Sequence, residues 1–370
     1  MENLERKGKM SPWQLGIIST SGLLTARLLS ATTNVVIYSE QFLWLSSALA
    51  GVFFYSAAYL MIRLAEQFPE ETIGEYIPRL VGKKFGTIIF LVFITVLLVN
   101  IINCTIALTT LSSIFLFDRT PHEFLVIVLL LAVVYCAMQN WGTILRVIQI
   151  LIFALPMLYI FYSLIWLNFE PLNLLPLWPD NFIGILQGVA YHTDYYAGYE
   201  SLLVLLPLAN RGKISFARTV GWGFLIITLI YVFGGIVLIG SITAKTVELI
   251  QDPVIYGMKS VELPGTFIER LENYMIIFFI PVTYISMALS YFVVAEGCRK
   301  YLKYNDHRIF IPVFLPLIFL VSSFVDTPQR QAVFQHFRMF IALFFSFVII
   351  PILLFLVWRK KGSDQQCEVE

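Results

Sequence analysis

The chain has 370 residues, of which 58% are hydrophobic and 13% charged, and its net charge is +1. A soluble domain is about half apolar and about a quarter charged, and its surface leaves too little interior to bury a larger apolar share. This composition excludes a water-soluble fold, and the balanced charge excludes a nucleic-acid-binding surface. Four cysteines are too few for a disulfide scaffold. We therefore expect an all-α polytopic protein embedded in the lipid bilayer.

A helix that crosses the hydrocarbon core needs about 20 apolar residues. The sequence contains ten such segments. In chain order they are 12–37, 41–66, 85–116, 121–139, 142–167, 182–208, 216–243, 270–299, 308–326 and 336–358. The ten N-terminal residues lead directly into the first segment, so we expect no cleaved signal peptide.

The distribution of lysine and arginine predicts the orientation of these spans. With the N-terminus in the cytoplasm, 18 of them fall on the inner side and 6 on the outer side, Arg338 being counted among the outer ones. Cytoplasmic loops carry an excess of positive charge. We therefore expect both termini in the cytoplasm, and a multi-pass protein of a bacterial cell membrane.

Ten spans divide into two sets of five, and an odd number in each set inserts the second set upside down. The predicted organisation is a cytoplasmic N-terminal tail (1–11), a first five-helix repeat (12–167), an outer loop (168–181), a second five-helix repeat (182–358) and a cytoplasmic C-terminal tail (359–370). Transporters built as inverted repeats place their site where the first helix of each half is interrupted. Both first helices here contain a polar interruption.

In the first span the interruption is Ser19-Thr20-Ser21-Gly22, and in the sixth it is the longer segment 193–200. An unwound turn frees backbone N–H and C=O groups that lipid cannot satisfy, so they must face protein, water or ligand. The new half-helix N-terminus suits a carboxylate, and the free carbonyl groups before it suit an ammonium group. A small zwitterion such as an amino acid matches both ends. The alternative for the first span is that these small residues only allow close helix packing.

Charged residues mark the same region. Asp194 and Glu200 lie within one apolar span, where a carboxylate is costly and indicates a functional site. Arg27 follows the first break and is predicted to pair with Glu200, Asp194 or Glu40, or to extend toward the outer interface. We assign Arg27 and Glu200 to gating or to an ion pair, and we expect His192 to be a hydrogen-bonded structural residue.

Two other spans carry polar stripes. Asn100 and Asn103 share one face of the third span, and Thr283 and Ser286 share one face of the eighth. These stripes either line a central pocket or join helices through hydrogen bonds. The predicted ligand-binding residues are Ser19, Thr20, Ser21, Gly22, Leu23, Asn100, Asn103, His192, Thr193, Asp194, Tyr195, Tyr196, Gly198, Tyr199, Thr283 and Ser286.

Two loops contain more than connecting residues. The inner loop 67–84 mixes apolar and charged residues at helical spacing, which predicts a short helix lying in the membrane interface. The outer loop 244–269 is either a solvated connection or a lid or docking element. The sequence contains none of the motifs of P-loop, hydrolase, zinc-protease or dinucleotide-binding enzymes. We expect no enzymatic activity, no cofactor and no metal site, and the cysteine spacing predicts no disulfide.

In the order and spacing of several motifs, the chain resembles the spore germination permease family. These proteins are the B subunits of nutrient germinant receptors, within the amino acid–polyamine–organocation superfamily. The motifs are Ser11-Pro12-Trp13-Gln14-Leu15, Arg27, Arg63 with Phe68-Pro69, Thr72 and Glu75-Tyr76, Gly198-Tyr199-Glu200-Ser201-Leu202-Leu203 with Pro207, and Phe267-Ile268-Glu269-Arg270-Leu271-Glu272. The resemblance covers nearly the whole chain.

The resemblance implies a five-plus-five inverted repeat in the inner membrane of the dormant spore. It also implies a subunit that acts with germinant receptor A and C subunits, binds a small nutrient, often an amino acid, and triggers germination. The first break departs from the glycine-rich pattern of the family because it has one glycine, which bears on the identity of the nutrient. Two alternatives remain at this point: an ion-coupled amino-acid transporter, and a membrane-embedded transferase for lipid-linked substrates.

Overall fold

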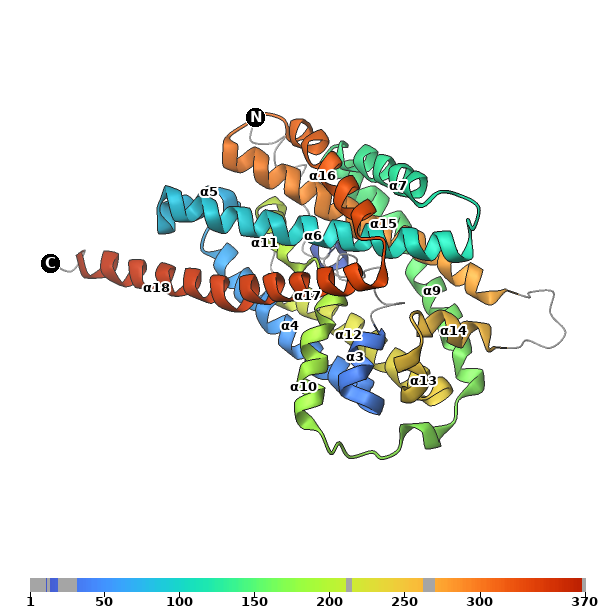
Figure 1. Ribbon diagram of the computed structural model, residues 1–370. Helices are drawn as coiled ribbons and strands as arrows, with labels where there is room; N and C mark the ends of the chain where they lie inside the picture. The colour runs from blue at the N-terminus through green and yellow to red at the C-terminus, as the bar shows by residue number, and fades with distance from the viewer. Residues whose placement is uncertain (1–10, 12–13, 19–31, 211–214, 262–269, 368–370) are drawn as a thin grey trace.

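The computed structural model describes residues 11, 14–18, 32–210, 215–261 and 270–367, and within these residues it is helical without β-strands. The predicted residues Ser19, Thr20, Ser21, Gly22, Leu23 and Arg27 lie outside the described residues. Figure 1 shows the helices as a bundle in which the long α6 (Lys83–Phe115) packs against α15 (Leu271–Leu302), while α18 (Ile350–Cys367) packs against α4 (Leu43–Glu66) and extends toward the C-terminus.

The first half of the chain forms helices within each of its predicted spans. Residues 14–18 are helical. The further helices of this half are α3 (Thr32–Ser39), α4 (Leu43–Glu66), α5 (Ile73–Val81), α6 (Lys83–Phe115), α7 (His122–Ala137), α8 (Trp141–Leu151) and α9 (Ala154–Ser163).

The second half begins with an interrupted helix and continues with long ones. Its elements are α10 (Phe182–Tyr191), α11 (Leu202–Leu205), α12 (Phe216–Ile242), α13 (Ala244–Leu249), α14 (Pro253–Lys259), α15 (Leu271–Leu302), α16 (Ile311–Phe324), α17 (Pro328–Phe344) and α18 (Ile350–Cys367). A π-helical turn, Phe345–Ile349, joins α17 to α18.

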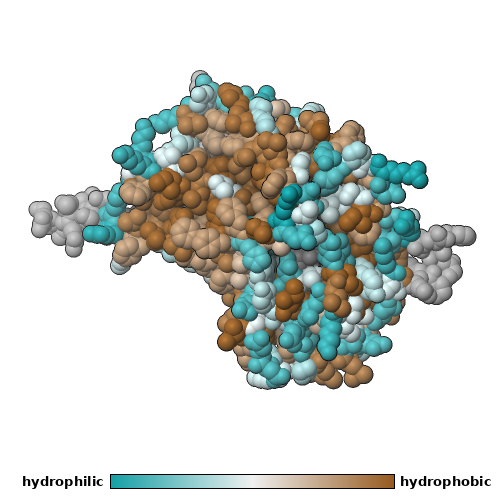
Figure 2. Space-filling model, viewed as in Figure 1, coloured by the Kyte–Doolittle hydropathy of each residue, from teal (hydrophilic) through white to brown (hydrophobic). Residues whose placement is uncertain are grey.

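Seven helical stretches of the described chain are long and apolar enough to cross a membrane, and two shorter apolar helices accompany them. Figure 2 shows a broad apolar area over the face that carries α6 and α18, while hydrophilic residues gather toward α13 and α14. Large apolar side chains such as Val52, Phe153 and Val333 are more than two-thirds exposed, which lipid tolerates and water does not. The exact number of crossings stays a prediction.

Small residues set how closely the helices approach. α4 packs against α12, and at Gly51 an added Cβ would overlap the side chain of Thr228. Membrane helices use such small residues because close backbone approach increases van der Waals contact where no hydrophobic force drives association.

The predicted inner loop contains α5, but this helix packs on protein. Thr72 and Glu75 form a capping box, in which the backbone N–H of Thr72 donates to Glu75 Oε2 at 2.9 Å. The apolar face of α5, including Tyr76 and Ile77, is buried, and α5 contacts α6, α15 and α18. Lys300 of α15 reaches Glu75 at 3.5 Å. The prediction of a short helix in this loop is therefore confirmed, and its position in the membrane interface stays a prediction.

Contacts between loops follow the predicted sides of the membrane. On the inner side, Lys360 at the end of the last span donates to the carbonyl oxygen of Arg79 at 3.0 Å. On the outer side, Asn168 Nδ2 donates to the carbonyl oxygen of Ser260 at 2.9 Å. Each contact thus joins loops that are predicted to lie on the same side, and which side faces the cytoplasm stays a prediction.

The last span differs from its prediction in one respect. Its helix begins at Pro328 rather than at residue 336, because Thr327 caps the N-terminus and proline suits the first helical position. Arg338 consequently lies well inside the helix rather than near its start, and it is buried. Its assignment to the outer loops was wrong, and five outer lysines and arginines remain of the six.

Candidate functional site

The sixth span is broken, as the sequence predicts. α10 ends at Tyr191, and only short helical turns (His192–Asp194, Tyr199–Ser201) precede α11. At the centre of the break, Gly198 adopts φ 102°, a left-handed conformation that is costly for residues with a Cβ. All residues of the segment 192–201 are buried, so its backbone groups face protein rather than lipid.

An ion pair lies beside this break. The Arg338 guanidinium of α17 contacts the Asp194 carboxylate through Nη2, and the two residues are only 3% and 5% exposed. Removing both charges from solvent is costly unless they are paired, so each residue fixes the other in place. Among the described residues, Arg338 Nε has no hydrogen-bond partner, which leaves a donor for water or ligand.

Asn103 of α6 approaches the same carboxylate, with 3.5 Å between its Nδ2 and Asp194 Oδ1. Asp194 therefore joins three elements, which are the broken span, α6 and α17. The sequence left two roles open for Asn103, lining a pocket or joining helices, and this contact joins α6 to the break.

Glu200 acts on the backbone of the break. Its Oε2 accepts the N–H of Gly198 at 2.9 Å, and its side chain is buried. The described charged groups at the break are thus two carboxylates and one guanidinium.

His192 uses both ring nitrogens in hydrogen bonds. Nδ1 lies 2.8 Å from the carbonyl oxygen of Gly188, so this nitrogen donates, and Nε2 lies 2.9 Å from Ser47 Oγ of α4. The ring is completely buried. This placement fits the structural role that the sequence predicts for His192.

The three tyrosines of the break reach three different helices. Tyr195 OH lies 2.7 Å from Thr32 Oγ1 of α3, and Tyr196 OH lies 2.8 Å from Thr228 Oγ1 of α12. Tyr199 OH lies 2.7 Å from Ser346 Oγ, in the π-helical turn of the last span. The tyrosine side chains therefore hold the break against its surroundings. π-helical turns are frequent at functional sites.

The interior next to Tyr195 is closely packed. A cavity of about 20 Å³ lies between Tyr195, Tyr231, Thr32 and Ser47, which is room for about one water molecule. This volume is far below that of small-molecule sites, which is about 300–1,000 Å³.

The predicted residues Asn100, Thr283 and Ser286 are buried on α6 and α15. Asn100 Nδ2 donates to Ser290 Oγ at 3.3 Å, which is the helix-joining role left open as an alternative. Thr283 and Ser286 are fully buried on α15, and the hydroxyl of Thr283 has no hydrogen-bond partner among the described residues. Thr193 donates to the carbonyl oxygen of Ala190 at 2.5 Å.

Two residues of the last span were not predicted. Arg338 and Ser346 both contact the break. The sequence contained a signal for Arg338, because an arginine followed by about 20 mostly apolar residues belongs inside a span. Within the described residues, no three His, Cys, Asp or Glu side chains are grouped to hold a metal ion.

Comparison with solved structures defines the class of protein. The fold resembles a Na⁺-coupled sialic acid symporter in a substrate-bound outward-open state, with a TM-score of 0.65, 11% identity, and 92% of this chain and 78% of that chain covered. A manganese transporter of Eremococcus coleocola gives a TM-score of 0.58 at 12% identity with the same coverage. The chain is therefore a helical membrane protein with a transporter fold.

Sequence comparison gives the family. Residues 9–331 match the sequence model of the family described as Spore germination protein. Spore germination protein YndE of Bacillus subtilis (strain 168) is 25% identical over 96% of this chain and 98% of its own length. Spore germination protein A2 of the same organism is 24% identical over 86% of each chain. The chain belongs to the spore germination protein family, whose members are permease-like membrane proteins rather than enzymes.

Proposed function

We propose that the chain is the integral membrane subunit of a spore nutrient germinant receptor. It binds a small nutrient, which we propose to be an amino acid, in the middle of the membrane between broken helices 1 and 6. Binding of the nutrient triggers germination. The observation that carries this proposal is the buried break at residues 192–201, held by the Asp194–Arg338 pair.

The break supports binding on chemical grounds. Unwound backbone at membrane depth occurs where it faces a cavity or protein, and the half-helix ends provide opposite partial charges. The ammonium group of the nutrient meets carbonyl groups near His192 and Thr193. Its carboxylate meets N–H groups after Gly22, and Tyr195, Tyr196 and Tyr199 surround its side chain. Arg27 and Glu200 act in the gate.

The contacts between the break and its neighbouring helices also support a sensor function. Asp194 connects α17 and α6 to the break, and three tyrosines connect the break to α3, α12 and the π-helical turn. A ligand that shifts the break therefore moves contacts on most sides of the bundle, and it needs only a differential affinity for two states. The second candidate function is ion-coupled amino-acid transport, which the fold neighbours favour.

Membership of the family supports a proposal about the receptor assembly. Relatives carry names such as Spore germination protein B2 and GerQB, and we propose that this chain acts with germinant receptor A and C subunits. It lies in the inner membrane of the spore with both termini in the cytoplasm.

The Gly198→Leu variant tests the proposal in spores of a host that lacks its own receptors of this family and produces the matching A and C subunits. Leucine strains the left-handed backbone at Gly198, so we expect the nutrient response to be lost while the protein still inserts into the membrane. Gly142→Leu is the matched control, because a Cβ at Gly142 meets open space. A normal dose–response curve in Gly198→Leu spores would contradict a site at the break.

A further inference from the structure

The segment that joins α9 to α10 exposes large apolar side chains although it belongs to no long helix. It runs along the rim of the molecule (Figure 1) and contains one short helical turn, Pro171–Leu174. Residues 171–179 include no charged side chain. Four of their apolar side chains are more than half exposed, and these are Leu172, Leu175, Leu177 and Trp178. In the outer loop that the sequence predicts here, contact of these side chains with water would be unfavourable.

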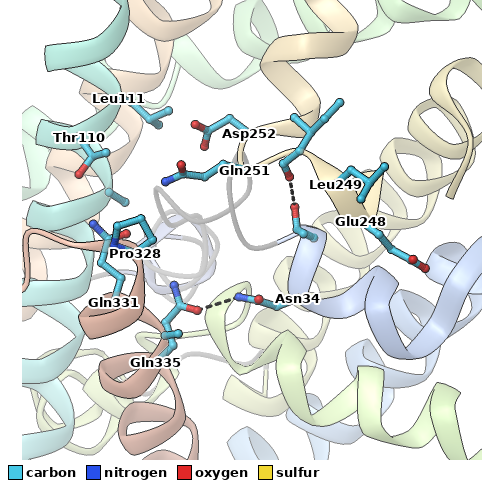
Figure 3. A pocket seen from close by; sticks show the side chains of 14 residues that line it. Asn34, Thr110, Leu111, Glu248, Leu249, Gln251, Asp252, Pro328, Gln331 and Gln335 are labelled. Atoms are coloured by element: carbon cyan, nitrogen blue, oxygen red, sulfur yellow. Dashed lines mark hydrogen bonds between the residues drawn. The ribbon is translucent and has the colours of Figure 1, made fainter. Parts of the chain in front are cut away.

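A cavity on the same predicted side of the membrane is polar by contrast. It measures about 330 Å³ and lies between α3, α6, α17 and the segment that joins α13 to α14. Figure 3 shows Asn34 Nδ2 donating to Gln335 Oε1 at 2.7 Å at this cavity, with Leu249 next to Glu248 in its lining. Water suits such a lining, and Leu249 is therefore an exposed leucine with polar neighbours. The segment 171–179 provides no such neighbours within its own length.

The exposed apolar surface continues from this segment into the helices on both sides. The preceding stretch Trp141–Asn168 is long and apolar enough to cross a membrane, and only 17% of its apolar part is buried inside the protein. Ile160 of α9 and Ile183 of α10 are both more than half exposed. Apolar side chains that a spanning helix does not bury in protein face lipid. The segment 171–179 thus connects two helices that have lipid-facing side chains.

The length of α10 sets the level of the segment in the membrane. α10 has 10 residues and therefore rises about 15 Å, which is half of a hydrocarbon core about 30 Å thick. From a break in the middle of the membrane, α10 reaches the outer boundary of the core at Phe182. The residues that precede Phe182 then lie at the level of the lipid headgroups.

The backbone of the segment suits this boundary. Irregular backbone is not tolerated inside the hydrocarbon core, and three residues of the segment, Pro171, Pro176 and Pro179, have no N–H group that needs a partner. At the start of the segment, the N–H of Glu170 and Nδ2 of Asn173 both donate to the carbonyl oxygen of Gly240, at 2.9 and 2.8 Å. These bonds fix the segment to the outer end of α12 (Phe216–Ile242).

We propose that residues 171–179 form an anchor in the outer leaflet of the bilayer. The backbone of the anchor lies among the headgroups, and Leu172, Leu175, Leu177 and Trp178 insert between the upper parts of the acyl chains. Tryptophan suits this depth because its ring is apolar and its N–H group is polar. Lipid is the partner because the anchor continues the lipid-facing surface of both adjoining helices. The anchor thereby fixes the depth at which α10 begins, whatever nutrient the chain binds.

Fluorescence quenching measures the depth of the anchor. The full-length chain, with its four native cysteines replaced by alanine, receives a single bimane label at Leu177→Cys. Nanodiscs of phosphatidylglycerol and phosphatidylethanolamine expose both faces of the protein to the same buffer, so the orientation of the chain does not affect the result. The quenchers are iodide in the buffer and lipids with a nitroxide near the top or near the end of the acyl chain.

Two labelled positions serve as matched controls. Leu249→Cys replaces an exposed leucine beside the polar cavity, and Phe153→Cys replaces an exposed side chain near the middle of the stretch Trp141–Asn168. We expect the label at Leu177→Cys to lose most of the iodide quenching that is measured at Leu249→Cys. We also expect the shallow nitroxide to quench it more than the deep one, with the reverse order at Phe153→Cys.

A variant tests whether the apolar side chains hold the segment in the lipid. With the label moved to Leu172→Cys, we expect Leu177→Asn combined with Trp178→Gln to restore iodide quenching. The control is Ile114→Asn combined with Phe117→Gln, which replaces two exposed apolar residues at the end of α6 and after it. This control should leave the quenching at Leu172→Cys unchanged. Unchanged quenching in the Leu177→Asn, Trp178→Gln variant would show that protein contacts alone hold the segment.

Two results would overturn the anchor. Equal iodide quenching at Leu177→Cys and Leu249→Cys in nanodiscs would place the segment in water. Iodide quenching that is lost at Leu177→Cys only after germinant receptor A and C subunits are added would make the segment a docking surface for a subunit rather than for lipid. Both results are independent of nutrient binding, so the anchor and the proposed function fail separately.

Discussion

A single arginine organises the charged residues at the centre of this protein. Arg338 is nearly fully buried and contacts Asp194 in the broken sixth span, where Asn103 also approaches. Such a pair contributes little net stability over apolar residues, but loss of one partner leaves an uncompensated charge. The pair therefore specifies how the last span meets the break more than it adds to the free energy of unfolding.

This predicts a double-mutant effect. Asp194→Asn and Arg338→Gln each destabilise the protein by about 3–5 kcal/mol, because each leaves one buried charge unpaired. Combining them removes both charges, and we expect the double variant to regain part of the lost thermal stability, measured on detergent-purified protein. Additive losses in the double variant would show that the two residues do not act as a pair.

Individual contacts at the break were the features least completely predicted from the sequence. Asp194, Glu200 and His192 are conspicuous because each is polar in an apolar span, and the structure places all three in the break. Arg338 was missed because the predicted helix starts at residue 336, which put Arg338 at its outer end and left it counted with the outer charges. The partner of Asp194 could not follow from sequence, since the two residues are far apart in the chain.

At the scale of elements, the break is held by its neighbours. Thr228 of α12 reaches Tyr196 of the break, and it is close to α4 because residue 51 is glycine. The packing of α4 on α12 and the position of Tyr196 are therefore coupled. Sequence reasoning predicted the long helices and the interrupted sixth span from hydropathy, but helix contacts such as this one depend on the three-dimensional path.

We accordingly expect Gly51→Leu to disturb both the packing of α4 on α12 and the position of Tyr196. The larger side chain displaces Thr228 and overpacks the α4–α12 contact, which costs about 1–3 kcal/mol, and it releases Tyr196. A lower melting temperature together with a weaker nutrient response is the expected result. The adjacent Val52→Leu is the control, because Val52 is 72% exposed. Equal melting temperatures in the two variants would contradict the close approach at Gly51.

At the scale of the whole molecule, a transporter fold is combined with a densely packed centre. The described residues next to Tyr195 leave about 20 Å³, while the outer cavity measures about 330 Å³. The described molecule is thus packed more closely at the break than at its loop ends, where cavities of about 510 and 450 Å³ also lie beside Arg79 and His307. Composition and charge distribution suffice to predict a multi-pass helical bundle, because they follow from the bilayer as solvent. They contain no information on which side a cavity opens.

The central claim is that a nutrient binds this chain within the membrane and signals. The most direct measurement reconstitutes the purified chain in liposomes with its A and C subunits and scores binding and uptake of labelled amino acids on the same vesicles. We predict saturable binding that is lost in Gly198→Leu and retained in Gly142→Leu, with no uptake above that of empty vesicles. Saturable uptake driven by an ion gradient would make the protein a transporter, and absence of binding to the complete complex would contradict an amino-acid site.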